Sequence, residues 1–334
     1  MMPTPRPSWR DDLAALVACH STPGDEDEVA RHLLAAWTAA GWTVTRHGRA
    51  AISASRPGRS GGPRLLVCAH MDSPGFAVEA VGPERMAVIP LGKPLVKGPA
   101  TEVVLKAAGE RHWAVLEREP ETPGRPAAFW MPTVDGARPG DRLCFHGALA
   151  TADDGSLAGP FLDNRLGCAV LCEWARRLAT LPTDLEIVLG ATACEEMGGF
   201  GAPALAQALR PDLVICLDAT YANAAQGVFL GGGPVLTLSD ASILLGCAER
   251  DAMLDFAAAA GLPLQTEVYN VSGTDARAFP QVGLTARVHA LLLPTEGNHG
   301  PEEQADGADL EALLALLDAL VEPGAWQRAW VTSF

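Results

Sequence analysis

The feature that most constrains the fold is an alternation of apolar, strand-length runs with segments of helical periodicity. The clearest strand-like runs are RLLVCAH at 64–70, DLEIVLGATAC at 184–194 and DLVICLDAT at 212–220. Apolar residues recur at helical spacing over 8–20, 25–41, 163–181, 201–210, 248–261 and 308–321. Alternation of this kind predicts an α/β fold with a mixed β-sheet sandwiched by helices.

Residues 75–151 have a different character. Gly and Pro are frequent, short β-like pieces such as FAVEA (76–80) and HWAVLE (112–117) follow one another, and no long helical pattern occurs. These features predict a small inserted β-barrel or β-sandwich domain. The expected organisation is a discontinuous α/β domain over 1–74 and 152–334, interrupted by a β domain over 75–151.

The charge balance argues against two classes of partner. Forty acidic and 25 basic residues give a formal net charge of −15, whereas nucleic acids and anionic membranes bind basic surfaces. No apolar stretch is long enough for a membrane span, and the N-terminus MMPTPRPSWRDD lacks the apolar region of a signal peptide. Eight scattered cysteines without a CxxC pair complete the prediction of a cytoplasmic protein with buried free thiols.

Several side chains able to bind a metal ion follow the apolar runs. Ligand crevices of open α/β sheets form at the carboxyl ends of strands, so these side chains are expected to lie together. Two histidines with several carboxylates suit zinc, cobalt or manganese, whereas an all-oxygen set would favour magnesium or calcium. The candidates are His70, Asp72, Asp163, Glu195, Glu196, Asp218 and His299.

Each candidate also has an ordinary structural explanation. Asp163 could cap the following helix, Asp218 could end a strand in a turn, and His299 lies in a Gly- and Pro-flanked loop. Singly these explanations are the better ones, but the joint placement at successive strand ends favours a metal site. Cys194 has no evident base partner and is expected to be a small core residue. The remaining histidines are expected to be structural: His20, His32, His47, His112, His146 and His289.

Glu195 and Glu196 are adjacent like charges that precede Gly198 and Gly199. Successive side chains leaving a strand point to opposite sides, so the two carboxylates need not compete for one position. Nearby divalent cations would offset their repulsion, and the glycines allow the chain to turn tightly beside the site.

A set of motifs extends this pattern along the chain. It comprises His70-x-Asp72, Asp163-Asn164-Arg165, Glu195-Glu196 before Gly-x-x-Gly-Ala, Asp218, Gly273-Thr274-Asp275-Ala276 and His299. In order and context the set resembles the dinuclear-metal glutamyl/leucyl (deblocking, TET-type) aminopeptidases, which form tetrahedral self-compartmentalised particles. Some relatives carry a mistaken endoglucanase label. The resemblance spans nearly the whole chain, including STPGDEDEV at 21–29 and the inserted β domain.

The resemblance implies a cytoplasmic, metal-dependent aminopeptidase that hydrolyses N-terminal residues from peptides with a free N-terminus. It implies two divalent metal ions per chain, zinc or cobalt, with manganese as a further candidate. The discontinuous domain would be a zinc-peptidase-like catalytic domain. The insertion would serve dimerisation or assembly into a homo-oligomer, from a dimer up to a dodecamer.

The resemblance also implies individual roles. Asp163 would bridge two metal ions about 3.5–4 Å apart. The ion on one side would be completed by His70 and Asp218, and the ion on the other by Glu196 and His299. Catalytic roles would fall to Asp72, which would hydrogen-bond the ring of His70, and to Glu195, the general base that takes a proton from the attacking water.

The chain departs from the family pattern around these residues. Cys194 stands where the family usually has Gln, Phe200 where it has Arg, and Ser73-Pro74 where it has an acidic-aliphatic pair. Glu296-Gly297-Asn298 replaces the end of the usual Pro-Thr-Arg-Tyr run. All proposed ligands and the base remain, so the departures bear on substrate preference and assembly.

Two other functions remain open at this stage. The same scaffold could serve a two-metal amidohydrolase, such as an N-acyl amino acid deacylase or a carboxypeptidase. A non-catalytic assembly protein would instead show an incomplete ligand set, and this set looks complete. A glycosidase is rejected because its carboxylates flank a sugar bond about 5–9.5 Å apart and need no histidine ligands.

Overall fold

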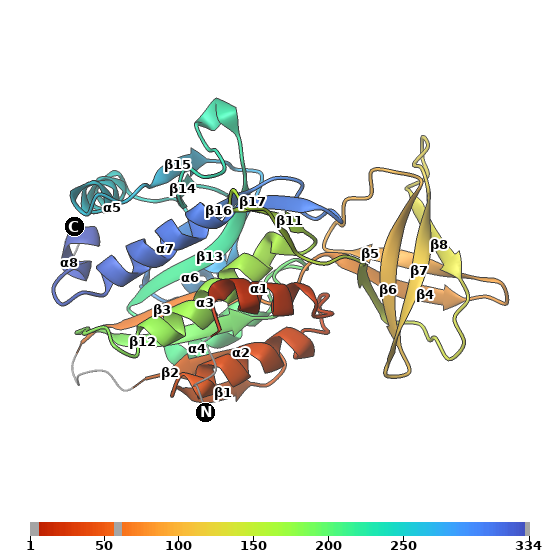
Figure 1. Cartoon of the computed structure of the whole chain (residues 1–334), viewed down its shortest axis with the longest axis horizontal. Helices are drawn as coiled ribbons and strands as arrows, with labels where there is room; N and C mark the ends of the chain where they lie inside the picture. The colour runs from red at the N-terminus through yellow and green to blue at the C-terminus, as the bar shows by residue number, and fades with distance from the viewer. Residues whose placement is uncertain (1–6, 57–61, 331–334) are drawn as a thin grey trace.

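The computed structural model describes residues 7–56 and 62–330. They form an α/β part built on an eight-stranded sheet and, to one side of it, a closed β-barrel (Figure 1). Part of the N-terminal segment on which the signal-peptide prediction rests, residues 1–6, lies outside the described residues. No helix in the described ranges is long and apolar enough to cross a membrane.

The sheet is mixed, as predicted from the strand–helix alternation. Its four central strands β12, β3, β13 and β16 run parallel, while β2 joins β12 and β14 joins β16 in the antiparallel sense. The order is β1 (Thr43–His47), β2 (Ala51–Ser55), β12 (Glu186–Thr192), β3 (Arg64–His70), β13 (Leu213–Tyr221), β16 (Arg287–Thr295), β14 (Val235–Ser239) and β15 (Gln265–Val268).

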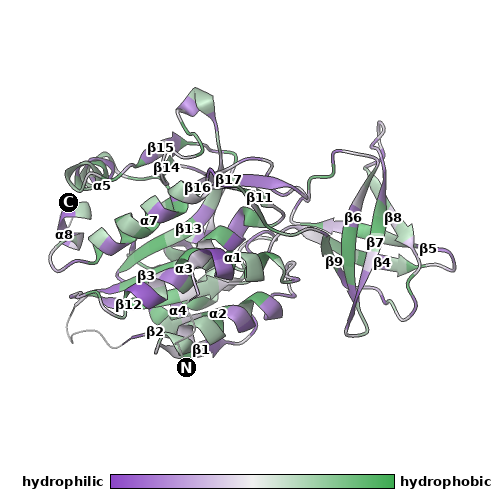
Figure 2. Cartoon of the chain, viewed as in Figure 1, coloured by the Kyte–Doolittle hydropathy of each residue, from purple (hydrophilic) through white to green (hydrophobic). Residues whose placement is uncertain are grey.

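Helices cover the sheet on both faces because its central strands are apolar on both. Along β3, Leu65 and Val67 pack into the largest core cluster, and Leu66 and Cys68 into a second one on the opposite face. The strand β13 shows the same apolar character in Figure 2. The first face carries α1 (Trp9–Val17), α2 (Asp27–Ala39), α3 (Leu162–Arg177), α5 (Cys247–Ala259), α7 (Gly307–Leu320) and α8 (Trp326–Ala329), and the second α4 (Gly201–Leu209) and α6 (Ala278–Gln281).

The insertion is a closed barrel rather than a sandwich. Its strands follow the order β4-β5-β8-β7-β6-β9, and β4 pairs with β9 to close it. Phe76 anchors a separate core, with ring centroids 5.3 Å from Phe129 and 5.7 Å from Phe145. No helix occurs between residues 75 and 151, as expected. The strands are β4 (Gly75–Val81), β5 (Arg85–Leu91), β6 (Ala100–Ala107), β7 (Glu110–Glu119), β8 (Ala128–Pro132) and β9 (Arg142–Phe145).

A small three-stranded sheet lies where the chain returns from the barrel. It pairs β10 (Ala150–Thr151) with β11 (Ser156–Gly159), and β11 with β17 (Glu303–Asp306). Two short 3-10 helices complete the fold, η1 (Ala224–Gln226) and η2 (Asp275–Arg277). The strands β8, β10, β11, β14 and β17 were not predicted from the sequence. The division into domains at residues 74 and 152 stays a prediction.

His289 on β16 is structural, as expected, but its environment is unusual. The ring is buried and stacks on Trp330, with centroids 5.1 Å apart. Neither ring nitrogen has a hydrogen-bond partner among the described residues. Burial, with a smaller contribution from the charge of Arg287, lowers the pKa of His289 to about 3.

Replacing this histidine is expected to make folding less sensitive to acid. An unfolded histidine titrates near about 6.5, so between about pH 6.5 and pH 3 the unfolded chain binds a proton at His289 that the folded chain does not. The contribution of His289 to the free energy of unfolding is complete above that window. Within the window, this contribution falls by about 1.4 kcal/mol for each unit by which the pH decreases. Urea unfolding at pH 7 and pH 5 should show a smaller loss for His289→Phe than for the wild type. Equal losses would contradict the prediction.

Candidate metal centre

His70 and Asp218 face each other because β3 and β13 are neighbouring parallel strands. Cys68 of β3 lies opposite Cys216 of β13 in the strand register. Each candidate ligand lies two residues further along its strand, on the same face. The Nε2 atom of His70 lies 3.0 Å from Oδ1 of Asp218 and 3.2 Å from Oδ1 of Asp163. The three side chains are buried, and their ligand atoms lie within 4.8 Å of one another. This first group is compact enough to hold one cation.

A second group shares Asp163 with the first. The Oδ2 atom of Asp163 lies 3.7 Å from Nε2 of His299, and Nε2 of His299 lies 3.4 Å from Oε1 of Glu196. Asp163 is in the first turn of α3, whereas His299 is in the loop between β16 and β17. One carboxylate therefore contacts both groups, one oxygen to each.

The site concentrates carboxyl groups in a buried place. Burial raises the pKa of Asp218 to about 6 and that of Glu195 to about 8, and raises the pKa of Glu196 well above its ordinary value. Burial also acts on Asp163, but contacts with His70 outweigh it and hold its pKa below the usual range. Oδ1 of Asp163 and Oε1 of Glu196 are buried and accept no hydrogen bond from the described residues. Unsatisfied oxygens among crowded carboxylates and imidazoles are the arrangement that divalent cations stabilise.

Asp72 is fully buried behind these ligands. Its carboxylate accepts hydrogen bonds from the backbone N–H groups of Glu195 (3.0 Å) and Glu196 (3.2 Å). The Nδ1 atom of His70 lies 3.0 Å from the backbone oxygen of Asp72 and 3.7 Å from its carboxylate. The expected contact between Asp72 and His70 therefore involves the main chain, and the carboxylate instead fixes the loop that carries the two glutamates.

The two glutamates lie in different surroundings, as expected, but they lie in the turn after β12 rather than on the strand, so strand alternation is not the reason. Glu196 faces His299, whereas Oε1 of Glu195 accepts a hydrogen bond of 2.9 Å from Arg277. Gly198 and Gly199 both have positive φ angles, of 117° and 69°, which only glycine adopts at low cost. The loop can thus turn back immediately after the pair.

A comparison with protein families bears on these residues. A family model described as M42 glutamyl aminopeptidase matches residues 134–316, more than half of the chain. The chain belongs to this family. The resemblance stated from the sequence motifs is confirmed.

Curated relatives agree with the M42 assignment. A putative aminopeptidase of Acetivibrio thermocellus is 30% identical over 183 residues, covering 53% of this chain and 54% of that protein. The glutamyl aminopeptidase of Lactococcus lactis is 27% identical over 304 residues, covering 80% and 83%. The chain spans about half the length of the first curated relatives it matches, the Acetivibrio protein and a putative aminopeptidase of Escherichia coli.

Solved structures share the M42 fold at low identity. A TET aminopeptidase from a marine sediment thaumarchaeon has a TM-score of 0.86 at 20% identity, covering 96% of this chain and 98% of that one. The TET1 peptidase of Pyrococcus horikoshii, described as assembling into a tetrahedron or a large octahedral shell, has a TM-score of 0.82 at 20% identity, covering 94% and 99%. A Thermotoga maritima structure named endoglucanase has a TM-score of 0.72 at 20% identity, covering 93% and 96%, in line with the expected label.

Arg165 and Asn164 of this M42 chain support the ligands without joining them. The Arg165 side chain is fully buried and donates to the backbone oxygens of Leu16, Ser21 and Met71 and to the Ser73 hydroxyl. Asn164 donates to the backbone oxygen of Leu217, beside Asp218. Together they tie the start of α3 to the ends of the neighbouring strands and so fix the position of Asp163.

Glu303 is a residue of the site that the sequence analysis missed. It lies on β17 and is almost completely buried. Its carboxylate accepts hydrogen bonds from the backbone N–H groups of Asp163 (2.8 Å) and His299 (2.9 Å). Burial raises its pKa well above the ordinary value. In the sequence it stands in the acidic run Glu302-Glu303, which resembles a solvated surface and offered no distinguishing signal.

Both groups open into one cavity of about 660 Å³. Lys93, from the loop after β5, lies on its wall, so the barrel insertion contributes to the site. The other two lysines of the insertion lie elsewhere: Lys97 lines a separate cavity of about 190 Å³, and Lys106 pairs with Asp25. Further lining residues are Leu95, Tyr221, Ala241, Tyr269, Val271 and Arg277.

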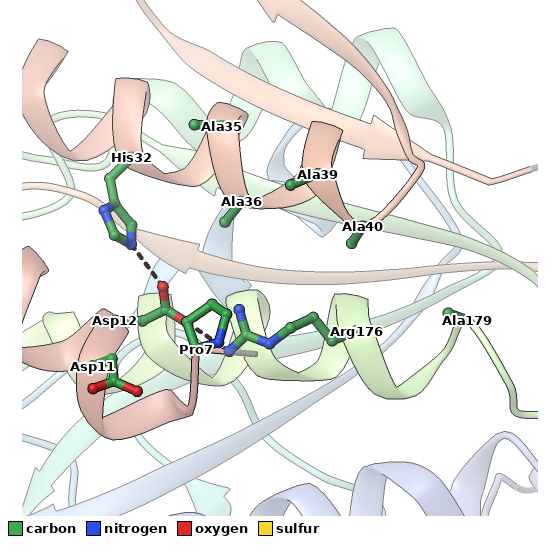
Figure 3. Close-up of a pocket in the computed structure, with 10 residues that line it drawn as sticks. All are labelled: Pro7, Asp11, Asp12, His32, Ala35, Ala36, Ala39, Ala40, Arg176 and Ala179. Carbon is green, nitrogen blue, oxygen red and sulfur yellow. Dashed lines mark hydrogen bonds and ion pairs between the residues drawn. The ribbon is translucent and has the colours of Figure 1, made fainter. Parts of the chain in front are cut away.

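A third cluster of potential ligands lies between α1, α2 and α3, away from this cavity. Asp12, His32 and Cys172 could offer three ligand atoms, and a pocket of about 490 Å³ adjoins them (Figure 3). However, one oxygen of Asp12 contacts Nε2 of His32 at 2.9 Å and the other accepts from Arg176 at 2.6 Å. Burial also raises the pKa of the Cys172 thiol well above its usual value, which opposes the thiolate form that binds metals. This cluster is a structural ion pair network.

Proposed function

We propose that the protein is a metal-dependent aminopeptidase. The observation that carries the proposal is the pair of ligand groups that share Asp163, placed beside Glu195 on the wall of one cavity. Membership of the M42 family and the names of the aminopeptidase relatives support it.

The donor set suits two divalent cations per chain. His70, Asp163 and Asp218 would hold one ion, and Asp163, Glu196 and His299 the other. Imidazole together with carboxylate favours zinc, cobalt or manganese. When bound, such ions polarise the scissile carbonyl and lower the pKa of the attacking water.

The residues of the chain account for the other requirements of the reaction. Glu195 is the general base, because its carboxylate lines the cavity and is not among the ligands. Asp72 fixes the backbone of this base through the hydrogen bond to its N–H group. A substrate with a free α-amine brings a positive charge to a pocket lined by carboxylates, which favours peptides with an unblocked N-terminus.

The proposal is tested by paired substrates. After chelation and reconstitution with zinc, cobalt or manganese, the protein should cleave a free-amine peptide and leave its N-acetylated counterpart intact. Cleavage of only the blocked peptide would favour the deacylase alternative, and release of the C-terminal residue would favour a carboxypeptidase. Absence of cleavage by the metal-loaded protein would point to the non-catalytic alternative.

We also infer that the chain forms a homo-oligomer. TET relatives with the same fold are described as a dodecamer and as tetrahedral or octahedral shells. The barrel offers an outward apolar surface at Trp113 and Val115 of β7, which are 59% and 38% exposed. Sedimentation velocity measures the assembly state directly, and a monomer at micromolar concentration would contradict the inference. The cytoplasmic location stays a prediction.

A further inference from the structure

Arg277 makes a contact for which the function proposed above has no role. It lies at the end of η2, directly after the Gly273–Ala276 motif, and lines the same cavity as the ligand groups. Its Nη2 atom donates to Oε1 of Glu195 at 2.9 Å. The Glu195 side chain is 8% exposed and that of Arg277 is 33% exposed. The guanidinium group thus borders the open cavity while it holds a buried carboxylate.

The backbone under Arg277 is tied to the strand that leads to Glu195. The carboxylate of Asp275 accepts a hydrogen bond from the hydroxyl of Thr192, the last residue of β12. Thr274 caps η2 through its side chain, which accepts from the N–H of Ala276. The N–H of Thr274 in turn donates to the hydroxyl of Ser242 at 2.6 Å. These contacts hold the backbone that carries Arg277 against the strand that leads to Glu195.

The two oxygens of the Glu195 carboxylate differ in their contacts. Arg277 is the only described side chain that hydrogen-bonds to this carboxylate, and it reaches Oε1. No hydrogen bond from the described residues reaches Oε2. A carboxylate held by one oxygen can present the other in a defined direction, whereas an unheld one rotates about its terminal torsion.

We propose that Arg277 is a positioning residue for the general base: it holds Oε1 of Glu195 so that Oε2 faces the attacking water. This inference rests on the proposed function in that Glu195 must be the base. An ordinary, partly exposed ion pair would contribute only about 0–1 kcal/mol to stability and would leave catalysis unchanged. If Arg277 instead bound the substrate, its replacement would raise KM.

The experiment compares Arg277→Met and Arg277→Gln with the wild type. Misplacement of a reacting group costs up to about 100-fold in rate, so kcat is expected to fall about 10- to 100-fold while KM changes by less than about threefold. Metal content and Tm should stay at wild-type values. Arg277→Lys should recover part of kcat, as should millimolar guanidinium added to Arg277→Ala. Arg250→Ala is the matched control, since this exposed arginine pairs with Asp251 on α5 and does not line the cavity.

Unchanged kcat in either variant would overturn the proposal, and so would a raised KM at wild-type kcat. If Arg277→Met fails to fold, Arg277→Gln decides. If the wild type cleaves only blocked peptides, the aminopeptidase assignment fails, but the same kcat comparison on those peptides still tests Arg277. If it cleaves nothing, crystal structures decide: the Glu195 carboxylate should be turned in Arg277→Gln, and an unchanged orientation would overturn the inference.

Discussion

Glu195→Gln is expected to lower kcat by about two to four orders of magnitude while the protein keeps its metal ions. Glutamine has the same shape, and its amide oxygen can still accept the hydrogen bond from Arg277. It cannot take a proton from the attacking water. Because Glu195 is outside both ligand groups, the loss should be confined to the chemical step.

Steady-state kinetics on a free-amine peptide, together with elemental analysis, provides the measurement. KM and metal content should remain close to those of the wild type. Glu322→Gln is the matched control, because this glutamate is exposed and does not line the cavity. Full activity of Glu195→Gln would rule out the proposed base.

The environment of Glu195 implies that the proposed base would depend on bound metal ions. Without cations, burial raises the pKa of Glu195 to about 8. At pH 7 this carboxyl would therefore be mostly protonated and unable to accept a proton. Positive charge in the neighbouring groups lowers the pKa of a nearby carboxyl. In the proposed function, bound cations would both relieve the repulsion within this buried acidic cluster and make the base available.

The candidate ligands could be proposed from the sequence because their placement follows from local pattern and strand register. His70 and Asp218 each follow an apolar run, and two neighbouring parallel strands bring such ends together. Closure of the barrel was harder to predict from the sequence, because it depends on the pairing of β4 with β9. No local pattern distinguishes that pairing from a sandwich of the same strands.

The supporting contacts could not be derived from the sequence for a related reason. Glu303 hydrogen-bonds Asp163 across 140 positions, and Arg277 reaches Glu195 across 82. Glu303 begins β17 and Arg277 ends η2, and the positions of both elements are set by the packed fold. Asp72 lies beside His70, as expected, but which of its oxygens contacts His70 depends on the turn after β3. Residue type predicts which residues belong to a site better than it predicts which atoms make each contact.

Asp163→Asn is expected to have the widest effect of any single substitution, because this residue belongs to both ligand groups. An amide supplies one neutral oxygen where the carboxylate supplies one charged oxygen to each side. Metal content should fall from about two ions per chain to less than one, and activity by at least about 10³-fold. The backbone N–H of residue 163 keeps its bond to Glu303, so the fold should persist.

Stability separates this loss of binding from a loss of structure. A metal ion that binds only the folded chain stabilises it by about 4 kcal/mol at 1,000 times its Kd. Added zinc should therefore raise the Tm of the wild type and of the control Asp135→Asn, an exposed barrel residue, and leave that of Asp163→Asn almost unchanged. Without metal, Asp163→Asn should be somewhat less stable than the wild type, since it removes the contacts with His70 that hold the Asp163 pKa below its usual range. Two retained ions together with a wild-type thermal shift would show that Asp163 does not bridge the groups.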